Sequence, residues 1–288
     1  MRHDSIPAFL GTHASALQKG PVAVILVEDL VEVDSTIRHH LACGFANILV
    51  LAPPALELAG DLEDGVHVIG HNTVVADAAV SGLNPLIARA KPGTWFFYCY
   101  NAEYLFYPFR ESRTVGEMLA FHVEERRDAM LTYVIDLYAA DLGTAANAVS
   151  LEDAYLDSAG YYALARHDAG GTIQERQLDF YGGLKWRFEE HANYKRRRID
   201  RISLFRAGPG VRLLPDHRMS VPEMNTFACP WHNNLTAAVA SFRTAKALKA
   251  NAGSTFEIES FQWAKSVKFD WHSQQLMDLG LMEPGQWF

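Results

Sequence analysis

The sequence predicts an α/β protein, because buried strands and an amphipathic helix alternate along its first part. Residues 22–27 (VAVILV) form a continuous apolar run, and residues 47–51 (NILVL) are apolar after Asn47. Both contain β-branched residues, as in parallel strands buried on both faces. The apolar residues between them recur at the spacing of one helical face: Leu30, Val33, Ile37 and Leu41. Gly44 follows where such a helix would end. Strand, helix and strand in this order predict a βαβ unit.

Later segments continue the alternation. Residues 66–69 (VHVI) and 95–100 (WFFYCY) predict two more strands, with a helix over residues 74–90 between them. Thr114 followed three residues later by Glu117 is the pattern of a capping box, which opens a helix. We further expect strands at residues 130–138 and 202–205, an irregular aromatic segment at 151–183, and helices at 234–250 and 260–269.

Composition excludes several classes of protein. The net charge of −8 argues against nucleic acid as a partner, because binding its phosphates needs a basic surface. The three cysteines, Cys43, Cys99 and Cys229, lie far apart and form no Cys-x-x-Cys pair, which argues against a zinc ribbon or a disulfide framework. Residues 1–19 lack the pattern of a signal peptide, and no apolar run is long enough to span a bilayer. We therefore expect a cytoplasmic protein.

Acidic and amide side chains follow two of the predicted strands. Glu28 and Asp29 come after the first strand, and Asn101 and Glu103 follow the aromatic strand. Ligands of open α/β sheets bind at the carboxyl ends of the strands, where carboxylates can hold a divalent cation that offsets the charge of a diphosphate. The alternative interpretation is structural, because any strand end needs polar residues.

Several short motifs follow one another along the chain. The first are Val27-Glu28-Asp29, then His39-His40 and Gly44-Phe45, then Trp95 followed by Asn101-Ala102-Glu103-Tyr104-Leu105-Phe106. The later ones are Asp136-Leu137-Tyr138, Asp157 with Tyr161, Tyr181-Gly182-Gly183 with Arg187, residues 201–205, His217 and His232. In this order, over roughly residues 20–265, the chain resembles bacterial family 2 glycosyltransferases.

The resemblance implies a GT-A-like fold, with a Rossmann-like mixed sheet flanked by helices. It implies one domain over residues 1–233, with a nucleotide half at about 20–110 and an acceptor half at about 111–233. Residues 234–288 are then a helical C-terminal extension packed on the same domain. The implied activity moves a sugar from a nucleotide-sugar donor to the hydroxyl of a sugar or lipid-linked acceptor, with inversion and with help from Mn²⁺ or Mg²⁺. Such a reaction serves surface polysaccharide or glycoconjugate synthesis.

The resemblance also suggests roles for individual residues. Asp179 and Asp136 are the candidates for the general base. The nucleotide would contact Glu28, Asp29, Asn101 and Glu103, whereas the acceptor or phosphate would contact Gly182, Gly183 and Arg187. The metal ligands would be Glu103, His217 and His232. The alternatives are a structural hydrogen bond for Asp136 and ordinary polar roles for the two histidines.

The motif at residues 101–103 departs from the family, which carries an aspartate where this chain has Asn101. An amide oxygen attracts a hard cation less than a carboxylate does, so metal binding is expected to be weaker than in a typical member. The second functional hypothesis is therefore a catalytically impaired relative that binds a nucleotide or sugar, or acts as a scaffold. An NAD-binding protein is disfavoured, because no Gly-x-Gly-x-x-Gly follows the first strand.

A basic run lies at Lys195, Arg196, Arg197, Arg198 and Arg201. One interpretation is a solvated loop. The other is a patch for an anionic acceptor or a membrane surface, which would place the protein in peripheral contact with a membrane.

Overall fold

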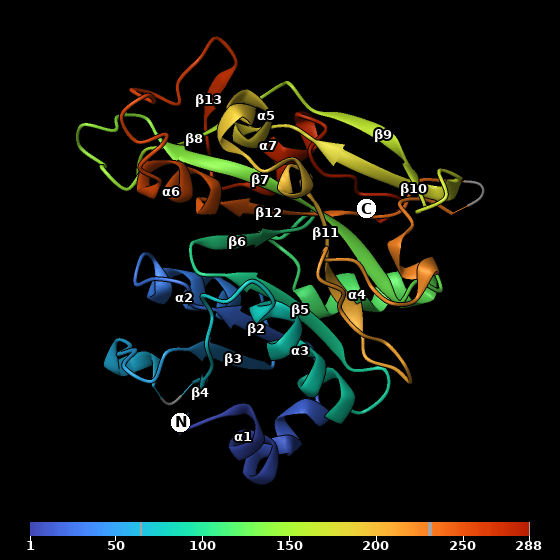
Figure 1. Ribbon diagram of the computed structural model, residues 1–288. Helices are drawn as coiled ribbons and strands as arrows, with labels where there is room; N and C mark the ends of the chain where they lie inside the picture. The colour runs from blue at the N-terminus through green and yellow to red at the C-terminus, as the bar shows by residue number, and fades with distance from the viewer. Residues whose placement is uncertain (64, 230–231, 288) are drawn as a thin grey trace.

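The computed structural model describes residues 1–63, 65–229 and 232–287, which fold around one large mixed sheet (Figure 1). Its strands lie in the order β1-β4-β3-β2-β5-β11-β7-β12-β6, with β8 pairing with β7 and β13 with β8. A separate hairpin joins β9 (Tyr162–His167) to β10 (Ile173–Tyr181). The α/β class and the mixed sheet predicted from the sequence are confirmed.

The first part of the sheet is parallel and changes its direction of winding at β2. The chain runs from β2 (Val22–Leu26) outward to β3 (Asn47–Ala52) and β4 (His67–Gly70), with β1 (Arg2–His3) beyond β4. It then returns to place β5 (Trp95–Tyr100) on the other side of β2. The carboxyl ends of β2 and β5 therefore flank the crevice where ligands bind in open α/β sheets.

The second part of the sheet mixes directions. β11 (Asp200–Arg206) runs antiparallel between β5 and β7 (Ala129–Ala139), so β7 points the same way as β5. β12 (Ala237–Ser241) is parallel to β7, and β6 (Glu103–Phe106) is antiparallel to β12. β8 (Ala154–Asp157) and β13 (Ser266–Lys268) extend this half. The carboxyl ends of β2, β5, β7 and β12 consequently share one edge.

Helices cover both faces of the parallel strands. Ala23 and Ile25 of β2 pack in the same core as α2 (Val33–Ala42) and α4 (Val115–Glu124). Val24 and Leu26 point to the opposite core, which contains α1 (Ile6–His13) and α3 (Ala78–Arg89). This alternation makes each strand apolar on both faces, as the continuous apolar runs predicted.

Two helix boundaries show how local sequence sets the elements. The predicted capping box is confirmed, since Thr114 Oγ1 accepts from the Glu117 backbone N–H and Glu117 Oε2 accepts from the Thr114 backbone N–H. The helix expected at residues 74–90 begins only at Ala78.

The short helical segments are α5 (Leu184–Arg187), α7 (Ser273–Asp278), η1 (Ala14–Gln18), η2 (Gly60–Leu62), η3 (Glu189–His191), η4 (Tyr194–Arg196) and η5 (Pro222–Asn225).

Three expectations for the later half of the chain are wrong. The first part of the helix expected at residues 234–250 is strand β12, and the helix α6 begins only at Arg243 and ends at Ala250. Residues 260–269 contain the short strand β13 and no helix, and residues 151–183, expected to be irregular, contain the strands β8, β9 and β10. Residues 234–288 are thus more than a helical extension, because β12 lies inside the main sheet between β7 and β6.

The helices of the described segments are short relative to a bilayer. None of them combines the length and the apolar character that a membrane crossing requires.

Candidate functional site

Polar side chains from neighbouring strands meet at the shared carboxyl edge of the sheet. Ser241 at the end of β12 is in register with Asp136 on β7 and with Glu103 on β6. Its hydroxyl donates to Glu103 Oε1 at 3.0 Å. Three adjacent strands therefore bring two of the predicted site carboxylates to one level of the sheet.

Asn101 joins the ends of β2 and β5. Its side-chain oxygen accepts the backbone N–H of Glu28 at 2.9 Å, and its Nδ2 donates to Asp29 Oδ1 at 2.6 Å and to the Val31 carbonyl at 2.8 Å. The side chain is fully buried, and both ends of the amide are used. The fold therefore employs an amide here because the position needs an acceptor on one side and donors on the other.

Glu103 forms a buried ion pair with Arg201. The two residues are 1% and 4% exposed, and Arg201 Nη2 donates to Glu103 Oε2 at 2.8 Å. The Tyr100 backbone N–H donates to the same oxygen, while Ser241 donates to Oε1. Burial alone would raise the pKa of Glu103, but Arg201 holds it below its ordinary value. The carboxylate is therefore ionised and already neutralised within the protein.

The first residues of α6 bind the end of β2. Arg243 donates to both oxygens of Glu28, at 2.6 and 2.7 Å, and its guanidinium lies 3.7 Å from the centre of the Tyr100 ring. Lys246 Nζ is 2.9 Å from Asp29 Oδ2 and 3.0 Å from Oδ1. Burial opposes ionisation of Asp29, yet the Lys246 contact leaves its pKa lowered. The C-terminal part of the chain thus closes one wall of the crevice.

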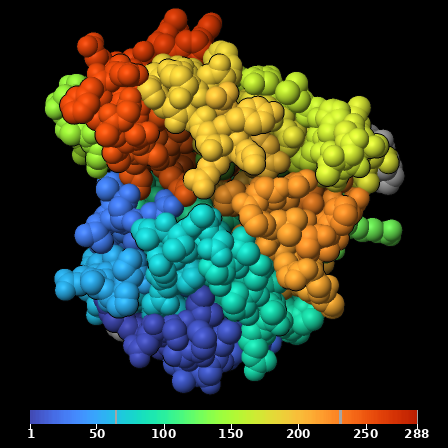
Figure 2. Space-filling model, in the orientation of Figure 1, coloured from blue at the N-terminus to red at the C-terminus, as the bar shows by residue number. Residues whose placement is uncertain are grey.

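Two adjoining hollows, of about 260 and 540 Å³, open above these groups. They have the following lining residues in common: Glu28, Lys185, Arg196, Arg198, Asp200, His217 and Arg243. Figure 2 shows the surface hollowed near its centre, where the cyan segment before α3 meets the yellow and orange segments of the later half. The larger hollow falls in the range of about 300–1,000 Å³ typical of small-molecule sites.

Asp136 is a buried carboxyl whose two oxygens differ in their hydrogen bonding. The residue is 2% exposed, and Oδ2 accepts the Leu184 backbone N–H at 2.9 Å. Oδ1 has no hydrogen bond of ordinary geometry among the described residues, although a side-chain hydrogen bond from Thr244 helps to lower the pKa of the carboxyl. Burial raises the pKa of Asp136 to about 6, against the opposing effect of Lys185. A carboxyl that titrates near neutrality has the property that a general base requires.

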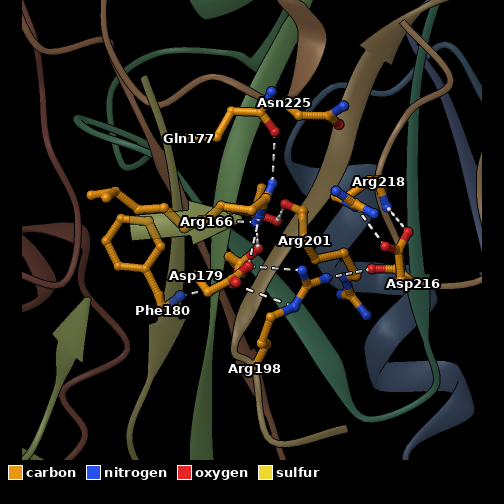
Figure 3. A network of polar contacts seen from close by, with 12 residues as sticks. Arg166, Gln177, Asp179, Phe180, Arg198, Arg201, Asp216, Arg218 and Asn225 are labelled. Carbon is orange, nitrogen blue, oxygen red and sulfur yellow. Dashed lines mark hydrogen bonds and ion pairs between the residues drawn. The ribbon is translucent and has the colours of Figure 1, made fainter. Parts of the chain in front are cut away.

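Asp179, the other candidate base, is held by two arginines. Its Oδ1 accepts from Arg166 Nε at 2.7 Å and from Arg198 Nη1 at 2.9 Å (Figure 3). Arg166 also pairs with the buried Asp200 at 2.7 Å. This arrangement ties the β9–β10 hairpin to the start of β11, and it favours Asp136 over Asp179 as the base.

The Gly182-Gly183 turn packs directly on the sheet edge. A Cβ on Gly183, whose φ is +63°, would lie 2.7 Å from Asp136 Oδ2, and one on Gly182 would lie 2.2 Å from the Tyr161 ring. Glycine is therefore required for this close approach. Arg187, which follows the turn, pairs with the buried Asp157 at 3.0 Å and stacks on Trp263. It does not line either hollow.

The two predicted metal-binding histidines have different surroundings. His217 lines both hollows, and its Nδ1 is 2.9 Å from the Tyr98 hydroxyl. Burial lowers the pKa of His217 to about 3, so the ring is neutral. His232 Nε2 lies 3.2 Å from Glu125 Oε2 at the end of α4. Within the described ranges no three histidine, cysteine or acidic side chains are grouped as a metal site would need, and the metal role of Glu103, His217 and His232 stays a prediction.

Several basic residues of the site were not predicted from the sequence. These are Lys185 on α5, and Arg243 and Lys246 on α6, whereas Arg198 belongs to the basic run noted in the sequence. The sequence gave one indication of a role for Lys185, because Lys185 and Arg187 lie on either side of Trp186, shortly after the glycine pair that marks a turn. Arg243 and Lys246 gave none, because basic residues at helical spacing are typical of any solvated helix face.

A scan against protein-family models finds no match for this chain, and a search of the curated proteins finds none either.

The first prediction concerns the buried ion pair. Arg201→Met leaves Glu103 buried without a counter-charge and is expected to lower the free energy of unfolding by about 3–5 kcal/mol. The double variant Glu103→Leu/Arg201→Met removes both charges and should recover most of this loss. Urea unfolding at pH 7 measures both variants.

Acid should weaken the same effect. The pKa of Glu103 is lowered in the folded state, so the stabilisation is present above its unfolded value of 4.5 and is lost as pH falls through the folded pKa. The difference between wild type and Arg201→Met should therefore shrink in acid. Equal losses for the single and double variants would contradict the ion-pair interpretation.

The second prediction concerns Asn101. Asn101 Nδ2 donates one hydrogen bond to Asp29 and one to the Val31 carbonyl. In Asn101→Asp a carboxylate oxygen replaces this nitrogen and repels both acceptors. We expect this variant to be about 2–3 kcal/mol less stable than wild type at pH 7. Asn147→Asp is the matched control, because its exposed side chain only accepts the Val149 N–H. It should change stability by less than about 0.5 kcal/mol. A stabilised Asn101→Asp variant would show that the position suits a carboxylate.

Proposed function

We propose that the protein is a glycosyltransferase that binds a nucleotide-sugar donor at the crevice between β2 and β5. The observation that carries the proposal is the meeting of charged strand ends at the point where the sheet changes its direction of winding. Ligands of open α/β sheets bind at such points. The hollow there is lined by guanidinium and ammonium groups, which suit a diphosphate.

The topology supports the finer expectation of a GT-A-like fold. Four parallel strands, β4-β3-β2-β5, form a nucleotide half of the Rossmann kind, and the antiparallel β11 joins it to the strands of an acceptor half. The motifs at residues 28–29, 101–103, 136 and 182–183 come together at one edge, as the resemblance to family 2 glycosyltransferases implies.

The proposed reaction is a single displacement. An acceptor hydroxyl attacks the anomeric carbon, the bond from that carbon to the diphosphate oxygen breaks, and the nucleoside diphosphate leaves with the bonding electrons. Asp136 Oδ1 is the proposed acceptor of the hydroxyl proton, because it is the carboxylate oxygen at this edge that has no hydrogen bond of ordinary geometry among the described residues. The basic lining stabilises the charge on the leaving group.

A second candidate function has its own support. The ion pairs Arg243–Glu28 and Lys246–Asp29 engage the acidic groups at the end of β2. A protein that only binds a nucleotide or sugar, or serves as a scaffold, needs no catalytic base and can keep such pairs closed. This alternative predicts nucleotide binding without transfer.

The third prediction tests the activity itself. Incubation with a panel of UDP- and GDP-sugars, with and without Mn²⁺, is expected to release the nucleoside diphosphate from one donor. Thermal shift with UDP and GDP reports binding in parallel. Binding without turnover would favour the second candidate, and the absence of both signals for every nucleotide would overturn the proposal.

The fourth prediction concerns Asp136. Asp136→Asn should leave nucleotide affinity unchanged within about threefold and lower turnover by about 10²–10⁴-fold, because the base is lost. Binding titrations and initial rates measure the two effects. Loss of binding together with turnover would assign Asp136 a structural role.

The same variant has a pH signature in stability. The folded pKa of about 6 exceeds the ordinary 3.8, so the folded state binds this proton more tightly and is destabilised as pH rises from about 4 through 6. At pH 8 Asp136→Asn should therefore be more stable than wild type by up to about 3 kcal/mol. At pH 4 the two should be nearly equal.

A further inference from the structure

We propose that the crevice binds its nucleoside diphosphate without a divalent cation, and that Lys185, Lys195 and Arg196 supply the positive charge that such a cation would supply. The inference rests on the proposed function, because it concerns the diphosphate of the same donor. It opposes the metal-assisted mechanism that the family resemblance implies.

The oxygen atoms at the strand ends do not fit a metal ion. The side-chain oxygen of Asn101 accepts the Glu28 N–H, and both oxygens of Asp29 face Lys246 Nζ. Glu103 accepts from Arg201, Ser241 and the Tyr100 N–H. A divalent cation bound by carboxylate oxygens would have to displace these donors, and a cation beside Arg201 and Lys246 would meet like charge.

Most of the basic residues around the hollow are already paired with acids. Arg201 pairs with Glu103, Arg243 with Glu28, and Lys246 with Asp29. Arg198 and Arg166 together lie against Asp179 and Asp200. Each of these groups has no net charge, so these groups do not determine whether the ligand is an anion or a cation.

Three cations remain without an acidic partner. Lys185 and Arg196 line both hollows and Lys195 lines the smaller one, and none of the three forms an ion pair with another described residue. Lys195 and Arg196 are exposed at the rim, on the 3-10 turn η4. Among the acids that line the hollows, Asp77 likewise forms no ion pair with a described residue. Three unpaired cations therefore face one unpaired carboxylate, and the net unpaired charge is positive, which favours an anion.

Of the three cations, Lys185 gives the strongest indication of an anionic ligand. It lies on the short helix α5, which the Leu184 N–H fixes to Asp136, and its Nζ makes one contact of 3.3 Å, to the Arg198 carbonyl. Burial disfavours its charged form, and Arg243 and Arg201 add to this effect, while Asp136 and Glu103 oppose it. A partly buried ammonium group with a single weak acceptor is stabilised by any anion that enters beside it.

The three unpaired cations match a diphosphate in number and in placement. Each phosphate of a nucleotide sugar carries a negative charge, and the leaving diphosphate gains more as the bond to the sugar breaks. Ammonium and guanidinium groups form short, charge-assisted hydrogen bonds with phosphate oxygens. Lys185 is partly buried and the other two residues are exposed, and all three line the smaller hollow, where such a group would bind.

The first experiment compares binding with and without metal. Calorimetric titration of the full-length protein with UDP and with GDP is carried out in EDTA and again in Mn²⁺. We expect the dissociation constant of the preferred nucleotide to agree within about threefold between the two conditions. Binding that requires Mn²⁺ would overturn this inference and leave the proposed function standing, whereas no binding in either condition would remove the proposed function itself.

The second experiment identifies the cations. Arg196→Ala and Lys185→Met are each expected to weaken nucleotide binding in EDTA roughly tenfold or more, because each removes a charged partner of a phosphate. Arg197→Ala is the matched control, since this neighbour pairs with Glu189 and lines neither hollow. Its dissociation constant should stay within about twofold of wild type.

Arg196 is exposed, so its variant is expected to fold normally, which thermal unfolding checks. Equal effects of Arg196→Ala and Arg197→Ala would show that only the general charge of the loop matters, and would overturn the assignment. Wild-type affinity in both Arg196→Ala and Lys185→Met would overturn it as well.

Discussion

The buried pair of Glu103 and Arg201 is the interaction on which the centre of the molecule depends. It joins the first residue of β6 to β11, and through Ser241 and the Tyr100 N–H it also holds the ends of β12 and β5. Such a pair does not by itself add stability over an apolar contact, because both charges lose their hydration. What the pair adds is register, because its hydrogen bonds tie β6, β11, β12 and the end of β5 together at one level of the sheet. Asn101 has the same function between β5 and β2, where its amide connects two backbones that close the crevice.

Much of the nucleotide half could be predicted from the sequence. The strands at residues 22–27, 47–51 and 95–100 were recognisable because a strand buried on both faces is apolar throughout. The position of Asn101 and Glu103 at a strand end followed from the same pattern. Their partners did not, because the sequence carries no signal that Glu103 faces Arg201 or that Asn101 faces Asp29.

The later half escaped prediction for physical reasons. Strand β12 (AAVAS) consists mostly of alanine, which favours helices, and only its burial between β7 and β6 makes it a strand. The pairs from Arg243 to Glu28 and from Lys246 to Asp29 join residues more than two hundred positions apart. Which charges meet over such separations is decided by the packing of the sheet, so the closed wall of the crevice became visible only in three dimensions.

The pairing of charges at this edge bears on how the site would work. Carboxylates that meet arginine and lysine within the protein are fixed in place before any ligand arrives, and in the proposed metal-free site they serve these pairs instead of a metal ion. Under the proposal, the ligand interacts with the cations that are left unpaired. The proposed proton acceptor, Asp136 Oδ1, is buried behind them and lines neither hollow. The cations and the carboxyl suit different steps, since the first attract a diphosphate and the second accepts a proton. Because Lys185 follows the turn that packs on Asp136, a phosphate bound at Lys185 would lie close to the group that accepts the proton. Donor binding and proton transfer would thereby depend on one short segment of the chain, residues 182–187.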